Sequence, residues 1–128
     1  MTIDTMIPPI GALLAGLAVL AGAFGAHALR DALTPEQSGW WETASRYQLA
    51  HGIALVLCAI PPAGRARTVA GFAFLVGIVA FCGALYGLAA GGPRWLGMVA
   101  PIGGAAMMVG WAALAVALVG GRRFRSWL

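Results

Sequence analysis

Two histidines, His27 and His51, bracket the only long polar stretch of an otherwise apolar chain. A pair of imidazoles can ligate a metal or a haem iron, relay protons, or tie helices together, because a neutral histidine carries one hydrogen-bond donor and one acceptor. Tyr86 and Arg94 are further polar residues beside apolar segments. What these residues can do depends on the elements that position them.

The composition is that of a membrane protein. Of the 128 residues, 61% are hydrophobic and 9% are charged, whereas soluble domains carry about 25% charged residues. The net charge of +4 comes from eight arginines and four acidic residues. The arginines stand at the ends of apolar runs, where arginine anchors proteins in lipid headgroups, and form no single basic face. We therefore expect a lipid bilayer as the surroundings and no nucleic acid as a partner.

A span takes about 20 mostly apolar residues, and four runs come close to this length. We expect one membrane domain over residues 1–128, with spans at about 7–29, 47–63, 68–90 and 95–120. The connectors between the last three spans are a few residues long, so consecutive spans are antiparallel neighbours. The predicted fold is all-α, an integral membrane four-helix up-down bundle.

An interfacial amphipathic helix is predicted between the first two spans, over about 35–46. In the segment TPEQ, Thr34 suits the N-cap, Pro35 the first helical position, and Gln37 can complete a capping box. We expect the helix that begins at Pro35 to run along the membrane interface and then to enter the membrane, with a bend near Gly39 or around Ser45. Three tryptophans are expected to act as interfacial anchors: Trp40, Trp41 and Trp95.

The distribution of arginines predicts the orientation. In a four-span arrangement, both termini and the second connector lie on one side, which carries five arginines against three on the other side. The positive-inside rule places the side with five arginines in the cytoplasm. Both termini are therefore expected to be cytoplasmic.

Small residues at helical spacing mark surfaces on which helices can approach closely in lipid. One stripe lies on the first span and another at the end of the third: Gly11, Ala15, Ala18 and Gly22, and Gly83, Gly87 and Gly91. We expect these stripes to pack within the chain. The alternative is that one of them forms a contact between two copies.

The predicted spans bring the unusual polar residues to one face of the membrane. His27 lies about one turn before the end of the first span, and His51 about one turn inside the second, so both fall within roughly 7 Å of that face. Tyr86 ends the third span there and Arg94 begins the fourth, while Tyr47 shares the helix face of His51. We predict that His27 and His51 lie near each other and near Tyr86.

Three interpretations of this cluster stay open. It can be a set of structural hydrogen bonds, since polar groups in a bilayer need partners. It can line a proton or substrate path, since ionisable groups inside membranes are functional candidates. Ligation of a metal or haem has the least support, because two histidines without Cys, Asp or Glu at the same depth are too few for a zinc site. We expect no metal and no cofactor.

The sequence gives no support for enzymatic chemistry. Cys58 and Cys82 lie inside apolar runs without the close spacing of a metal or redox motif, and their different depths predict free thiols. The chain lacks a Ser-His-Asp set and a glycine-rich phosphate loop after a strand, and no Asp or Glu lies within a span, which disfavours a proton-coupled exporter. We expect no enzymatic activity and no catalytic residue.

Four segments, in this order, resemble the domain-of-unknown-function 423 family, which is related to the transmembrane protein 256 group. They are GAFGAHAL (22–29), ETASRYQLAHGIAL (42–55), FCGALYGLA (81–89) and RWLGMVAPIGG…GW (94–111). The resemblance implies a bacterial inner-membrane protein that crosses the membrane several times and has no assigned activity. The family motifs fall on His27, Tyr47, Gln48, His51, Tyr86, Pro101, Gly103 and Gly104.

The resemblance adds Gln48 to the candidate polar cluster. Its members are then His27, Tyr47, Gln48, His51, Tyr86 and Arg94. The chain departs from the family pattern where Cys82, Ala84 and Ala100 replace hydroxyl residues. Those hydroxyls are therefore not available to a transport path in this protein.

We expect a non-enzymatic membrane protein that acts by association, with a second copy of itself or with a larger membrane complex. The alternative is a small transporter or channel with a polar mouth formed by His27, Tyr47, His51 and Tyr86. A water-accessible cavity that passes the middle of the membrane favours transport. A sealed core of small residues with an exposed glycine stripe favours association.

Overall fold

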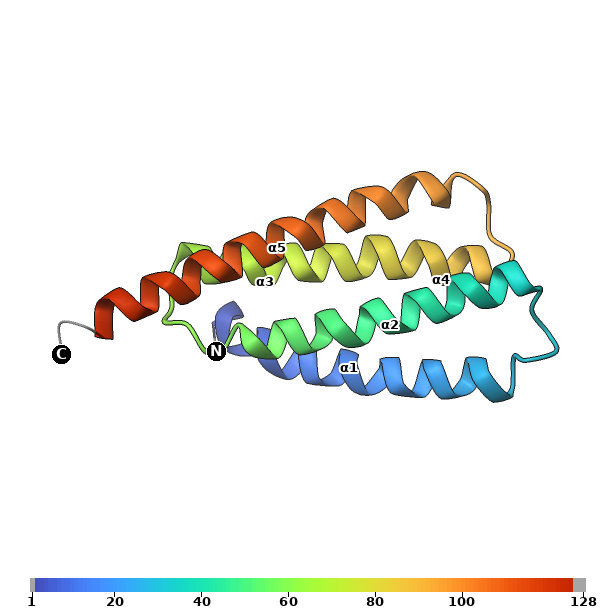
Figure 1. Cartoon of the computed structure of the whole chain (residues 1–128), viewed down its shortest axis with the longest axis horizontal. Helices are drawn as coiled ribbons and strands as arrows, with labels where there is room; N and C mark the ends of the chain where they lie inside the picture. The colour runs from blue at the N-terminus through green and yellow to red at the C-terminus, as the bar shows by residue number, and fades with distance from the viewer. Residues whose placement is uncertain (1, 126–128) are drawn as a thin grey trace.

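The structure is a computed structural model that describes residues 2–125, with side chains described as far as Arg122. Its elements are α1 (Ile3–His27), α2 (Pro35–Leu57), α3 (Arg65–Gly77), the π-helical turn η1 (Ile78–Cys82), α4 (Gly83–Ala89) and α5 (Leu96–Arg125). Because α3, η1 and α4 follow one another directly, they form one rod, which lies lengthwise beside α1, α2 and α5 (Figure 1). The predicted all-α class is confirmed.

The rod of α3 and α4 and the neighbouring helix α2 lie in the middle of the molecule. α1 packs chiefly on α2, and α5 packs chiefly on α3 and η1, so α1 and α5 lie on opposite outer sides (Figure 1). Side-chain contacts between α1 and α2 run antiparallel, since Trp41 reaches Ala21 and Gln48 reaches Leu14. α2 therefore has neighbours on both sides, whereas α1 has one main neighbour.

The segment predicted as an interfacial helix lies within the second long helix and packs on α1. Residues 35–46 are the first half of α2, which continues unbroken to Leu57. Its beginning is as predicted: Gln37 N donates to Thr34 Oγ1 at 3.2 Å, and Thr34 N donates to Gln37 Oε1 at 3.0 Å. The helix does not turn away from its neighbours, because Trp41 Nε1 donates to the carbonyl of Ala21 on α1 at 2.8 Å.

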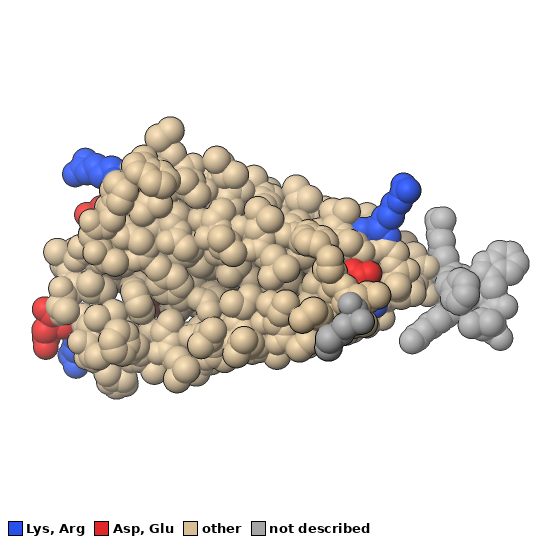
Figure 2. Space-filling view, turned by 180° about the vertical axis from the view of Figure 1, so that it is seen from behind, with Lys and Arg blue, Asp and Glu red and all other residues tan. Residues whose placement is uncertain are grey.

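Three helical segments of the described chain are long and apolar enough to cross a membrane: Ile3–His27, Arg65–Ala89 and Leu96–Arg122. α2 is not among them because it carries several polar residues. Three of its polar residues, Ser45, Gln48 and His51, are buried, whereas the charged Glu42 and Arg46 are exposed. Three of its large apolar residues are also exposed: Leu49, Ile53 and Val56. On the face shown in Figure 2, charged atoms lie towards the two ends of the molecule.

A set of hydrogen bonds at the end that holds the N-terminus ties α1 to α3. Pro8 lies inside α1 and has no N–H, so it cannot donate to the carbonyl of Asp4, four residues earlier. Arg67 donates to that carbonyl instead at 3.3 Å, and also to the carbonyl of Pro61 at 3.2 Å. Thr68 Oγ1 donates to Asp4 Oδ1 at 3.0 Å. Arg67 is therefore bound to backbone carbonyls inside the fold.

The small residues of α1 form its contact with α2. A Cβ atom at Gly11 would lie 2.5 Å from Leu55 Cβ, and one at Gly52 would lie 2.8 Å from the backbone nitrogen of Ala15. Gly22 faces Ser45 Oγ, 3.8 Å from the position of its missing Cβ. The two backbones therefore approach within a distance that side chains at these positions would prevent.

Gly83, Gly87 and Gly91, at the end of the rod formed by α3, η1 and α4, do not act as one packing stripe. A Cβ at Gly87 would lie 2.8 Å from Leu96 Cδ1, but Gly83 is exposed and has no atom within 4 Å. Gly91 follows α4 in a turn at φ +85°, a conformation that glycine adopts without strain. The prediction that this stripe packs within the chain is therefore wrong for Gly83 and for Gly91.

Candidate functional site

Gln48 of α2 connects three helices through its side-chain amide. Its Nε2 donates to the carbonyl of Leu14 on α1 at 2.9 Å, and its Oε1 accepts a hydrogen bond from the hydroxyl of Tyr86 on α4 at 2.8 Å. The side chain is 8% exposed. The amide can reach the backbone of α1 because Gly52, one turn further along α2, allows close contact there.

His51, one turn after Gln48, connects α2 to α5. Its Nδ1 lies 2.8 Å from the carbonyl oxygen of Tyr47, and since a carbonyl only accepts, Nδ1 carries the proton. Its Nε2 then accepts a hydrogen bond from the indole N–H of Trp111 at 3.1 Å. The neutral ring is satisfied at both nitrogens, and a second proton on Nε2 would face the donor of Trp111. We call Gln48, His51, Tyr86 and Trp111 the polar layer.

Aromatic rings enclose the imidazole of His51. The ring of Tyr47 stacks on it with an interplanar angle of 9° and a centroid distance of 5.8 Å, and Phe74 and Trp111 lie at the same centroid distance. Phe81 packs on Tyr47 with ring centroids 4.7 Å apart. This enclosure leaves His51 5% exposed, which keeps water from competing for its hydrogen bonds.

The π-helical turn η1 and Gly103 together position Phe81. A π-turn adds one residue to a helical turn and shifts the face that the following residues present. A Cβ at Gly103 would lie 2.3 Å from the backbone nitrogen of Phe81, so α5 touches the backbone of η1 directly. Gly103, one of the positions that the family resemblance indicates, thus permits the contact between η1 and α5.

Trp41 is half-buried, and its indole N–H, which an interfacial anchor would offer to lipid headgroups, is bonded within the fold. Its indole N–H is bonded to Ala21, and its ring packs edge-on against Tyr86 with a centroid distance of 4.8 Å. A Cβ at Gly25 would lie 2.4 Å from this ring. Trp40 is partly buried against the core, while Trp95 is 61% exposed.

The structure does not bring His27 to His51, and that prediction is wrong. Gln48 is level with Leu14, and position 27 is 13 residues beyond position 14 on α1, which amounts to roughly 20 Å along the helix. The expectation assumed that the second span starts at Tyr47. Because α2 starts at Pro35, His51 lies well inside the molecule, while His27 is exposed at the end of α1.

Arg94 also lies outside the cluster, exposed in the turn between α4 and α5. The residues that the structure does bring together are Tyr47, Gln48, His51 and Tyr86. Sequence analysis missed Trp111 as a member. It could have been predicted, because Trp111 places an indole N–H in the interior of an apolar run. Such a donor needs a hydrogen-bond partner where there is no water.

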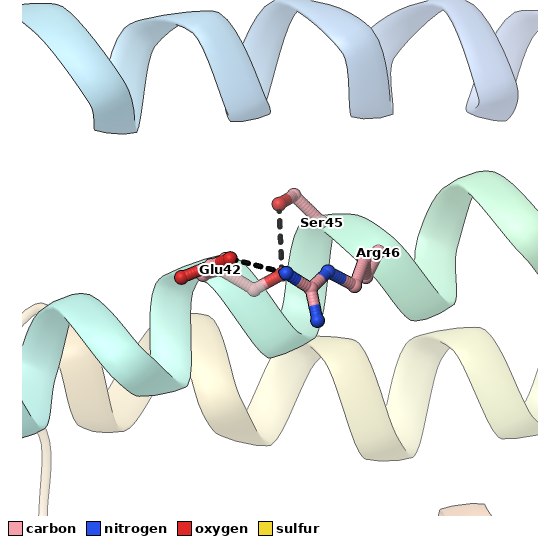
Figure 3. A network of polar contacts seen from close by, with 3 residues as sticks. All are labelled: Glu42, Ser45 and Arg46. Atoms are coloured by element: carbon pink, nitrogen blue, oxygen red, sulfur yellow. Dashed lines mark hydrogen bonds and ion pairs between the residues drawn. The ribbon is translucent and has the colours of Figure 1, made fainter.

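A cleft opens between the end of α1 and the start of α2, with a volume of about 360 Å³. Residues of both helices and of the loop between them line this α1–α2 cleft: Gly22, Gly25, Ala26, Arg30, Leu33, Ser38, Trp41, Glu42 and Ser45. Figure 3 shows Ser45 donating to the carbonyl of Glu42, and Arg46 paired with the Glu42 carboxylate. The cleft therefore has charges near its opening and small residues on α1.

The family model described as "Protein of unknown function (DUF423)" matches residues 21–104. This chain belongs to the DUF423 family. A UPF0382 membrane protein of Staphylococcus epidermidis is 42% identical over 110 residues, 84% of this chain and 90% of the relative. A UPF0382 membrane protein of Staphylococcus saprophyticus is 40% identical over 109 residues, 84% of this chain and 91% of the relative. No solved structure matches the chain.

Membership of the DUF423 family, together with three helices able to cross a bilayer, identifies the chain as a membrane protein. The family match includes Trp41, Gln48, His51 and Tyr86, whereas Leu14 and Trp111 lie outside residues 21–104. The residues outside the matched range therefore contribute a backbone carbonyl, from Leu14, and the indole of Trp111. The two cysteines, Cys58 and Cys82, are free and buried.

Proposed function

We propose that this DUF423 protein is a non-enzymatic, four-span protein of the bacterial inner membrane that acts by association, with a second copy or a larger membrane complex. The observation that supports this is the closed hydrogen bonding of the interior. Among the described residues, no buried side-chain nitrogen or oxygen lacks a hydrogen-bond partner. A transport path needs polar groups that can exchange partners with a passing solute. The polar groups of the polar layer are instead hydrogen-bonded to neighbouring helices.

The fourth span in this proposal is α2. From Tyr47 to Leu57 α2 carries no charge; its polar Gln48 and His51 are buried against neighbouring helices, while Leu49, Ile53 and Val56 are exposed, as expected for a helix that lies between other helices in lipid. It is level with α1 from Trp41 to Gln48. In this proposal the four helices run up and down, and the start of α1 and the end of α5 lie at the end that carries Arg65, Arg67 and Arg122, which the positive-inside rule places in the cytoplasm.

The alternative, a small transporter, is favoured by one observation, the α1–α2 cleft. Its lining residues lie on one end of α1 and of α2, and the deepest on α1 is Gly22. Further along, Trp41 bonds to Ala21 and Gln48 bonds to Leu14. These bonds close the space between the two helices, so the cleft supports an entrance but no continuous path.

Gly83 offers a direct test of association, because its position is open to the surroundings. Replacement Gly83→Leu adds a side chain where no atom lies within 4 Å, so we expect unchanged thermal stability in detergent. If α4 is the associating surface, this variant loses self-association or a co-purified complex. Gly16→Leu, an equally open glycine on α1, is the matched control.

The measurement counts subunits in lipid nanodiscs and identifies co-purified proteins in mild detergent. We expect a wild-type assembly that Gly83→Leu reduces and Gly16→Leu preserves. A parallel measurement records proton and solute flux in proteoliposomes. Flux that requires His51, from a protein that stays monomeric and captures no partner, would favour the transporter.

A further inference from the structure

The α1–α2 cleft combines features that the association proposal does not use. Its walls include Gly22 and Ala26 from α1, whose small size leaves room next to the backbone, and Gly25, over which the indole of Trp41 from α2 packs. Arg30 and Glu42 place opposite charges on the lining. A volume of about 360 Å³ lies within the usual range of small-molecule sites.

The depth of the cleft matches the headgroup region of a bilayer. The candidate span of α1 ends at His27, so Arg30 lies just outside it. Gly22 lies five residues inside that end, about 8 Å along the helix. A ligand in the cleft would therefore have its charged part at the membrane surface and its remainder beside the first apolar turns of α1.

The two ends of the cleft differ in the charge that they can bind. Arg30 presents a guanidinium, which binds phosphate through paired N–H donors. Ser45 is 7% exposed and donates to the carbonyl of Glu42 at 3.0 Å, so its oxygen lone pairs remain as acceptors. Together with the Glu42 carboxylate, whose Oε1 is paired with Arg46, it forms the acceptor side.

We propose that the α1–α2 cleft binds a phosphate group joined to a primary ammonium, the headgroup of an aminophospholipid. Arg30 binds the phosphate, and Glu42 with Ser45 accepts hydrogen bonds from the ammonium. The small residues of α1 accommodate the glycerol. A trimethylated ammonium has no N–H to donate, and a glycerol headgroup has no positive charge, so both bind more weakly.

The test measures lipid retained by the purified full chain in native mass spectrometry. The protein is exchanged into detergent that contains dioleoyl phosphatidylethanolamine, phosphatidylcholine or phosphatidylglycerol in equal amounts. We expect phosphatidylethanolamine to be retained about tenfold more than the other two, as the loss of one charge-assisted hydrogen bond predicts. Excess water-soluble glycerophosphoethanolamine is then added, and its failure to displace the lipid would assign the site to lipid rather than to a free headgroup.

Variants separate the cleft from general surface charge. Arg30→Gln is expected to lower retention of all three lipids about tenfold, and Glu42→Gln to remove the preference for the primary ammonium. Ala26→Leu fills the cleft without changing charge, whereas Ala23→Leu adds the same bulk to an exposed neighbour that does not line it. Arg65→Gln, at the opposite end, is the charge control.

Equal retention of the three lipids by the wild type would overturn the proposal, as would equal effects of Ala26→Leu and Ala23→Leu. Variants are compared only at matched helicity by circular dichroism. The result is independent of association, because a monomer can retain the lipid. Loss of assembly in Gly83→Leu with normal lipid retention would leave this site intact.

Discussion

α1 and α2 lie side by side in opposite directions, but they contribute differently to the fold. α1 presents backbone: the carbonyls of Leu14 and Ala21 accept hydrogen bonds, and its glycines allow close approach. α2 presents side chains: Trp41 and Gln48 donate to those carbonyls. The apolar helix α1 is therefore held by α2 through its backbone carbonyls and at its glycines.

This difference shows why the less apolar helix occupies the interior. α1 faces α2 along one side and exposes most of its large apolar side chains, including Leu13, Leu17 and Leu20. α2 has neighbours on two sides, so a polar side chain on it finds a partner on either. In lipid, where hydrophobic burial does not drive helices together, close packing and hydrogen bonds decide the order of the helices.

The largest effect is expected from blocking the approach of α1 to α2. In Gly52→Ala the new Cβ would lie 2.8 Å from Ala15 N and 2.9 Å from the carbonyl oxygen of Gly11, both backbone atoms that cannot rotate away. We expect a loss of about 3 kcal/mol in unfolding free energy, measured by denaturation in mixed micelles. Gly16→Ala, where no atom lies within 4 Å, is expected to be neutral or slightly stabilising.

Equal stability of the Gly52→Ala and wild-type proteins would show that α1 is held to α2 by side chains alone. The difference between the two helices would then lie in their polar groups and not in their backbone contact.

The second effect concerns Gln48, whose amide serves both neighbours of α2. Gln48→Leu removes two interhelical hydrogen bonds and leaves the hydroxyl of Tyr86 without its acceptor. Interhelical bonds in membranes average about 0.6 kcal/mol each, so we expect a loss of about 1–2 kcal/mol. A double-mutant cycle with Tyr86→Phe should give a coupling energy near 0.6 kcal/mol, and additive losses would mean that this bond contributes nothing.

The helical class and the start of α2 could be predicted because they depend on local sequence. Long apolar runs determine the helices, and the residues that make the capping box lie within four positions of one another, from Thr34 to Gln37. The packing of the first half of α2 against α1 was not predicted. That half looks amphipathic in isolation, and the carbonyl that Trp41 binds lies 20 residues away in sequence.

The candidate site was predicted in part, since Tyr47, Gln48, His51 and Tyr86 do meet. His27 and Arg94 were included because the ends of the apolar runs were used to place residues at a depth in the membrane. That placement depends on where each helix begins. Trp111 was missed because its partner is 60 residues away and no local pattern links them. The position of η1, which decides where Phe81 points, has no sequence pattern that we identified.

A third and smaller effect compares how the two helices begin. Thr34 accepts a hydrogen bond from the backbone of Gln37, whereas Thr2, the N-cap of α1, makes no side-chain cap bond. Thr34→Ala should therefore lower stability by about 1 kcal/mol, and Thr2→Ala should leave it unchanged. Thermal unfolding of both variants in the same detergent decides this, and equal losses would mean that residue type alone, without the capping geometry, accounts for the effect.

The smallest effect is expected at His51, although its ring is nearly inaccessible. His51→Leu removes the acceptor of the Trp111 indole and should lower stability by about 0.6 kcal/mol, the average for one interhelical hydrogen bond in a membrane. His51→Gln keeps an acceptor of similar reach and should lose less stability.

The tautomer of His51 gives an independent measurement. ¹⁵N-labelled histidine should show a protonated Nδ1 and an unprotonated Nε2, because the carbonyl of Tyr47 accepts from one nitrogen and Trp111 donates to the other. Trp111→Phe removes that donor and should let the Nε2-protonated tautomer appear. If the spectrum shows both nitrogens protonated near neutral pH, the imidazole is not held by these two partners, and α2 would be joined to α1 and α4 by hydrogen bonds but to α5 by packing alone.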